Sequence, residues 1–191
     1  MSTKIQYRLK FISDWHIGSG SGIPGLVDNG VLKDGSRSPM VTGKTIKGIV
    51  RDALEDILHL NQGAGGQESI DDIFGREGDR AGSAVFFNPQ LVEAADAPDG
   101  DIRSHTAIDR DKGTARKHQL YSEETSPQSL SYRGEIEVDD GFTGYILAAL
   151  RFVTKIGGKR RRGLGQCEFE IAAPQDYGSR IEEFLNEISK N

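Results

Sequence analysis

Residues 4–12 read KIQYRLKFI, a stretch in which polar and apolar side chains alternate from Lys4 to Phe11. The apolar positions are Ile5, Tyr7, Leu9 and Phe11. A period of two places the two sets of side chains on opposite faces of a strand. The stretch therefore predicts a strand with one buried face.

Two contrasting segments follow this strand. Residues 13–43 are rich in glycine, serine and proline and have no periodicity, which predicts a long loop of the kind that often carries function. Residues 45–60 then place apolar side chains at helical spacing, with charged side chains on the other face. The apolar positions are Ile46, Ile49, Val50, Ala53, Leu54, Ile57 and Leu58. We expect an amphipathic helix over residues 45–60.

Further elements are predicted by the same patterns. Residues 81–93, 132–138 and 166–172 are expected to form strands, the first with a turn near Asn88-Pro89. Residues 142–153 form an apolar run that fits either helix or strand, and residues 176–188 have the spacing of a final helix.

The order of these elements is β-α-β, an insertion, and β-α-β. This is the split β-α-β order of the ferredoxin-like fold, in which four antiparallel strands carry two helices on one face. Residues 94–130 lack apolar periodicity and are expected to be an inserted loop or hairpin. We therefore predict an α+β protein with a single domain over residues 1–191.

Composition limits the class of protein. The 191 residues are 36% hydrophobic and 28% charged, which is typical of a soluble globular chain. The longest apolar stretch is too short to span a bilayer and the N-terminus lacks the apolar core of a signal peptide, so we expect a cytoplasmic protein. Cys167 is the single cysteine, which excludes an internal disulfide and a zinc site built on several thiolates.

The net charge of −5 argues mildly against nucleic-acid binding, but the cations are unevenly distributed. Lys159, Arg160, Arg161 and Arg162 are consecutive and lie between glycines in residues 157–165, which we call the basic loop. Such a loop can approach a phosphate backbone closely and add N–H donors. Basic runs also occur as solvated turns, so these residues alone leave both interpretations open.

A second group of cations opens the predicted helix. The segment at residues 43–45 superficially suggests a P-loop, but Ser38 stands where that motif requires glycine and a polar loop precedes it, which excludes ATP hydrolysis. What remains is a helix N-terminus with Lys44, Lys47 and Arg51 stacked on one side, either an anion site or an exposed polar face.

Four motifs occur in a characteristic order. They are WHIGSG at residues 15–20, GKTIKGIVR at 43–51, Phe74-Gly75, and GKRRRGLG at 158–165. Over roughly residues 4–172 the chain resembles the RAMP superfamily of CRISPR proteins, most closely the backbone subunits of type III effector complexes. That family commonly has proline at the position of Thr42 and serine at that of Lys44, departures that affect only the entry to the helix.

The resemblance implies a filament of copies along a CRISPR guide RNA, together with other effector subunits and a complementary target RNA. It implies a ferredoxin-like palm and a thumb hairpin, which residues 100–130 fit, placed between guide and target. It also implies RNA contacts by the basic loop and by His16, Lys44, Lys47 and Arg51.

In that family an aspartate in the loop after the first strand cuts target RNA with a divalent metal. The matching position here is Asp28, so the resemblance implies that Asp28 is the catalytic residue and a ligand of Mg²⁺ or Mn²⁺. Such a carboxylate can hold the metal or orient the attacking 2′-hydroxyl. Asp34 is a less well aligned neighbour, and without the resemblance the residues favour a simple Asx turn at Asp28.

Two alternative functions remain open. One is an RNA-binding subunit of the same superfamily that does not cut. The other is a guide-processing endoribonuclease, which needs a catalytic histidine on its RNA-facing surface and usually has two ferredoxin-like halves, for which 191 residues leave little room.

Overall fold

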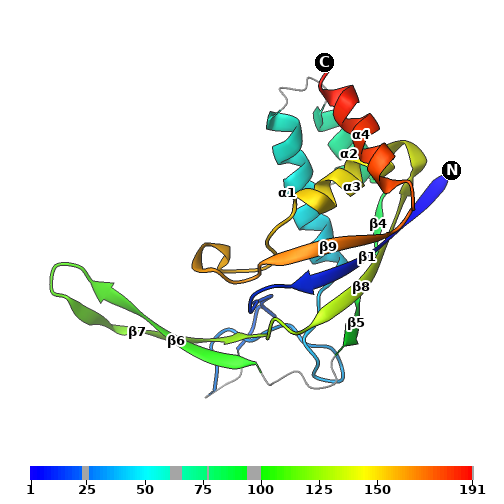
Figure 1. The fold of residues 1–191 in the computed structure, drawn as a ribbon. Helices are drawn as coiled ribbons and strands as arrows, with labels where there is room; N and C mark the ends of the chain where they lie inside the picture. Colours follow the sequence, from blue (N-terminus) through cyan, green and yellow to red (C-terminus); the bar gives the residue numbers. More distant parts are fainter. Residues whose placement is uncertain (23–25, 61–65, 77, 94–99, 191) are drawn as a thin grey trace.

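The computed structural model describes residues 1–22, 26–60, 66–76, 78–93 and 100–190. Its main layer is an antiparallel sheet in the strand order β4-β8-β1-β9, with β5 also paired to β8 (Figure 1). The strands are β1 (Ser2–Phe11), β4 (Val85–Phe86), β5 (Gln90–Glu93), β8 (Ser131–Asp139) and β9 (Cys167–Ala173). The strands predicted over residues 4–12, 81–93, 132–138 and 166–172 are confirmed.

Strand β1 lies in the middle of this sheet and has the predicted one-sided burial. It pairs with β8 from Ser2 opposite Asp139 to Lys10 opposite Ser131, and with β9 along its other edge. Ile5, Tyr7, Leu9 and Phe11 are buried, whereas the polar side chains that alternate with them, Lys4, Gln6, Arg8 and Lys10, are exposed or half-exposed. The alternation of residues 4–11 is therefore what gives the sheet one apolar face.

Four helices lie on one side of the sheet (Figure 1). They are α1 (Gly43–Leu60), α2 (Gly66–Phe74), α3 (Thr143–Phe152) and α4 (Tyr177–Ile188). The apolar run at 142–153 is thus a helix, and the order β1-α1-β4-β8-α3-β9 is the predicted β-α-β-β-α-β. The α+β class with antiparallel sheets is confirmed. Among the described residues, no helix is both long enough and apolar enough to cross a membrane.

Helix α2 and the short strands β2 (Gly75–Arg76) and β3 (Arg80–Ala81) were not predicted. The helix buries Ile70, Ile73 and Phe74, whose i, i+3, i+4 spacing covers less than two turns. It ends at Gly75, which has φ +82 and takes the left-handed conformation that closes many helices.

A long two-stranded hairpin occupies most of residues 100–130 and extends away from the sheet (Figure 1). It consists of β6 (Asp101–Asp109) and β7 (Thr114–Thr125). Its outer part is exposed, including Ile108 and Leu120, but Glu123, Thr125 and Ser126 at its base are buried. Residues 100–130 are therefore not uniformly a polar arm outside the core, because the end of this segment, from Glu123 to Leu130, includes buried residues.

Trp15 joins the long loop and the hairpin base to the sheet. Its ring is fully buried, stacks on Phe11 at 4.5 Å between centroids and meets the Tyr132 ring edge-on at 6.0 Å. Its backbone N–H and C=O both pair with the backbone of Ser126, at 2.9 and 2.8 Å, and its indole N–H donates to the carbonyl of Pro127 at 3.2 Å. Trp15 thus joins the sheet, the loop after β1 and the base of the hairpin.

The division of the hairpin into an exposed arm and a buried base predicts different outcomes for two deletions. Replacing residues 107–119 with Asn-Gly should leave a cooperative thermal transition within a few degrees of wild type, because the rung from Thr106 to Leu120 and the buried base remain. Replacing the whole of residues 100–130 with a Gly-Ser linker should abolish that transition, followed by circular dichroism. A cooperative transition in both variants would show that the base is not part of the core.

Candidate nucleic-acid interface

The basic loop is a tight turn whose cations point in different directions. Its centre is the 3-10 helix η2 (Arg160–Arg162), preceded by Lys159 in the left-handed conformation at φ 57 and followed by Gly163 at φ 85. Because a 3-10 turn rotates each residue by about a third of a circle, consecutive side chains cannot share one face.

The basic loop rests on the backbone of His16. The N–H of Gly158 donates to the His16 carbonyl at 2.8 Å, and a Cβ at Gly157, which has φ +91, would lie 2.3 Å from the same oxygen. The His16 ring is only 3% exposed, and its Nδ1 lies 2.7 Å from the carbonyl of Glu124 in the hairpin base. The His16 ring is therefore covered and supports the loop, and the prediction that His16 contacts RNA stays a prediction.

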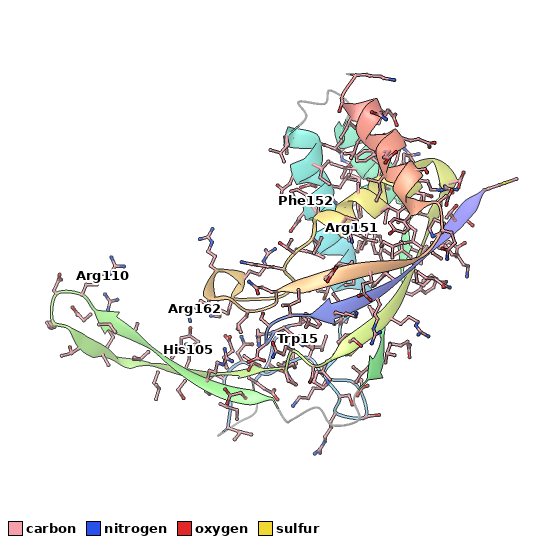
Figure 2. All side chains as sticks on the ribbon, viewed as in Figure 1. Trp15, His105, Arg110, Arg151, Phe152 and Arg162 are labelled. Carbon is pink, nitrogen blue, oxygen red and sulfur yellow. The ribbon has the colours of Figure 1, made fainter. Side chains whose placement is uncertain are left out.

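Lys159 and Arg162 face the hairpin, where the Tyr121 hydroxyl accepts from Arg162 Nη1 at 3.3 Å and from Lys159 Nζ at 3.4 Å. These two hydrogen bonds, that of Arg162 first, hold the pKa of Tyr121 below its usual value. Arg162 Nη1 also lies 3.4 Å from His105 Nδ1, on the neighbouring strand. Figure 2 shows the Arg162 and His105 side chains where the basic loop meets the hairpin. Lys159 Nζ is 3.6 Å from a carboxylate oxygen of the buried Glu123. Two cations and two aromatic rings thus gather where the basic loop meets the hairpin.

Arg160 and Arg161 line a different cleft, between α1, the end of α3 and the basic loop. This cleft of about 330 Å³ also contains the carboxylates of Asp52 and Asp56 and the exposed ring of Phe152. The four predicted cations are therefore divided into two pairs, one toward the hairpin and one toward the helices.

The cations of α1 form a third group. The N-terminus of this helix is closed by the protein itself, since Gly43 N–H donates to the Asn88 side chain at 2.8 Å and Thr45 N–H to the Thr42 hydroxyl at 3.1 Å. These two donors are therefore already used within the protein, and the anion site at this N-terminus stays a prediction. The side chains remain accessible: Lys44 is exposed, Lys47 is half-buried and Arg51 pairs with Glu55 at 2.9 Å.

The two candidate carboxylates behave differently. Asp34 forms an Asx turn, because its Oδ1 accepts from the N–H groups of Ser36 and Ser38, both at 2.9 Å. Asp28 is exposed and reaches across to the hairpin, where its Oδ2 accepts from the N–H of Ser122 at 2.7 Å and from the Ser122 hydroxyl at 3.0 Å. The local turn considered for Asp28 is thus found at Asp34 instead.

Asp28 does not belong to a complete metal centre. Within the described ranges, no group of three or more His, Cys, Asp or Glu side chains could hold a metal ion. One carboxylate nevertheless fits Mg²⁺ or Mn²⁺ as a single ligand, because Mg²⁺ is commonly bound through one or two carboxylates plus substrate phosphates and water. Asp28 therefore fits an ion that takes its other ligands from phosphate and water.

The antiparallel sheet, the helices on one side of it and the long hairpin define an α+β protein. The chain belongs to the RAMP superfamily, whose family model matches residues 8–168. No curated protein matches it in sequence.

The fold is shared with chains of solved structures. A chain of the type III-B Cmr-β complex in its apo state has a TM-score of 0.70 and 15% identity, with 88% of this chain and 97% of that chain covered. A chain of Cmr-β bound to cognate target RNA has a TM-score of 0.68 and 14% identity, with the same coverage.

The seating of the basic loop on His16 predicts unequal effects of two glycine substitutions. Gly157→Ala and Gly163→Ala both introduce strain at positive φ, but only Gly157 has a backbone atom in the way; nothing lies within 4 Å of a Cβ at Gly163. We expect Gly157→Ala to lower the free energy of unfolding by about 1–3 kcal/mol more than Gly163→Ala in urea titrations. Equal losses would mean that the loop does not depend on this contact.

Proposed function

We propose that this protein is a guide-RNA-binding backbone subunit of a type III CRISPR effector complex, and that Asp28 cuts the target RNA paired to the guide. In this role the main sheet and its helices are the ferredoxin-like palm and β6–β7 is the thumb. The observation that carries the proposal is that the basic loop and Asp28 both attach to the base of one hairpin. Superfamily membership and the shared fold with Cmr-β chains, one of them in a complex with target RNA, support it.

The surface formed where the basic loop meets the hairpin suits a single RNA strand. Lys159 and Arg162 offer charge for phosphates, while the half-buried Tyr121 and His105 rings offer surfaces on which bases can stack. Arg160 and Arg161 extend the cationic surface toward the helices. Lys44, Lys47 and Arg51 on α1 provide further phosphate contacts in this proposal. Such a subunit works in the cytoplasm beside copies of itself and other effector subunits.

Cutting would depend on Asp28. Its Oδ2 is held by Ser122, so Oδ1 can accept a hydrogen bond from the 2′-hydroxyl of the target or ligate the metal. When bound, Mg²⁺ or Mn²⁺ neutralises charge on the scissile phosphate.

The two pairs of cations in the basic loop permit a charge-matched test of guide binding. Lys159→Ala/Arg162→Ala and Arg160→Ala/Arg161→Ala each remove two positive charges. Both should weaken guide RNA binding for all sequences and reduce the slope of log affinity against log salt by about 0.7 per lost phosphate contact on single-stranded RNA. We expect the larger loss from the first pair, because it also faces the hairpin. Unchanged affinity and slope in both variants would make the loop a solvated turn.

The catalytic role is tested by Asp28→Asn with Asp34→Asn as its matched control. Asp28→Asn keeps the side-chain volume but removes the charge, so target cutting with Mg²⁺ or Mn²⁺ in the assembled complex should fall by about 100-fold or more. Guide and target binding should persist. Asp34→Asn should cut normally, as resolved on a sequencing gel.

Two outcomes would redirect the assignment. Cutting that survives Asp28→Asn and disappears in Asp34→Asn would move the site to Asp34. Absence of cutting by wild type with either metal would favour the non-cleaving subunit, and specific cleavage of unprocessed repeat RNA by the isolated protein would favour the guide-processing enzyme.

A further inference from the structure

We infer that Ser122 is a positioning residue that fixes the Asp28 carboxylate and thereby sets where the target is cut relative to the guide. This inference rests on the proposed function and deepens it, because it concerns the selection of the scissile linkage rather than the chemistry of cutting.

The first basis is the reciprocal bonding between the two residues. The N–H of Asp28 donates to the Ser122 carbonyl at 3.2 Å, while the N–H and hydroxyl of Ser122 donate to Asp28 Oδ2 at 2.7 and 3.0 Å. Both donors converge on one oxygen, and no hydrogen bond to Oδ1 is found within the described part of the chain. The contact thus fixes the carboxylate in one orientation with one oxygen still available.

The second basis is the place of Ser122 in β7. Its neighbours Tyr121 and Glu123 both contact Lys159, and Tyr121 also contacts Arg162. Alternate side chains of a strand face opposite ways, so Ser122 projects toward Asp28 while its neighbours project toward the basic loop. The separation between the cations and the carboxylate is therefore set by one strand. An RNA bound by Lys159 and Arg162 would therefore find the Asp28 carboxylate at a fixed distance from these cations.

The third basis is the environment of this strand segment. Glu123, which follows Ser122, is only 1% exposed. Asn29, which follows Asp28, forms a backbone bridge with Glu123. The two segments are therefore held together next to the Asp28–Ser122 contact as well. Small displacements of a catalytic group are costly, since a misplacement of about 1 Å can reduce a rate by about 100-fold. The serine hydroxyl is thus in a position to affect both the rate and the site of cutting.

The test compares Ser122→Ala, Ser122→Thr and Ser104→Ala in the assembled, guide-loaded complex. Ser104 lies directly opposite Ser122 in the hairpin, so its replacement removes the same hydroxyl from the same rung without touching Asp28. In Ser122→Ala we expect cutting to slow about 10-fold, to require more Mg²⁺ for half its maximal rate, and to spread to neighbouring linkages on a sequencing gel. Guide affinity should not change. Ser122→Thr, which keeps the hydroxyl, should restore both rate and position, and Ser104→Ala should match wild type.

The results separate this inference from the proposed function. If Asp28→Asn abolishes cutting while Ser122→Ala cuts at the normal sites and rate, the positioning role is overturned and the proposed function stands. If Ser122→Thr fails to restore the pattern, the serine acts only as packing and the positioning role is again overturned. If Asp28→Asn cuts like wild type, or wild type does not cut, the proposed catalytic role fails and the inference fails with it.

Discussion

The burial of Trp15 is the constraint on which the rest of the site depends. The residue lies four positions after the central strand, and its ring packs against Phe11 and Tyr132. Its backbone pairs with Ser126 at the base of the hairpin. Loss of a fully buried tryptophan side chain costs about 3–5 kcal/mol in general, a large part of the stability of a small domain. Because His16 comes next in sequence, the same anchor fixes the surface on which the basic loop rests.

The candidate site is assembled from segments far apart in sequence that meet at one short length of strand. Between Tyr121 and Ser126 the hairpin base contacts the basic loop, Asp28, the His16 ring and Trp15 in turn. Glu124 adds an ion pair with Lys33 at 2.5 Å and accepts the N–H of Val31 at 3.0 Å. The long loop after β1 has little regular structure of its own, and these contacts order it.

Local sequence patterns were enough to predict the main helices and strands. The surroundings of the candidate site residues depend instead on contacts between distant parts of the chain. The alternation in residues 4–11 and the helical spacing in 45–60 depend only on nearest neighbours, so β1 and α1 could be predicted. The closing of α1 by Asn88 depends on a residue 45 positions away, and the covering of His16 depends on both the hairpin and the basic loop. Neither contact can be predicted from the few residues on either side of Gly43 or His16. The division of Lys159–Arg162 into two pairs similarly follows from a turn geometry that a run of cations does not reveal.

The hairpin also has a mechanical consequence. From Tyr121 back to Thr114, where β7 begins, the arm extends seven residues, which at the usual rise per residue is roughly 23 Å beyond its last contact with the basic loop. A tilt of about 5° at that anchor displaces the tip by about 2 Å over such a length. The hairpin therefore acts as a rigid arm that pivots at Tyr121 and Ser122. A small rotation at these two residues moves the tip of the hairpin by a larger distance. A molecule that binds the tip can therefore exert a force on the segment of β7 that is bonded to Asp28.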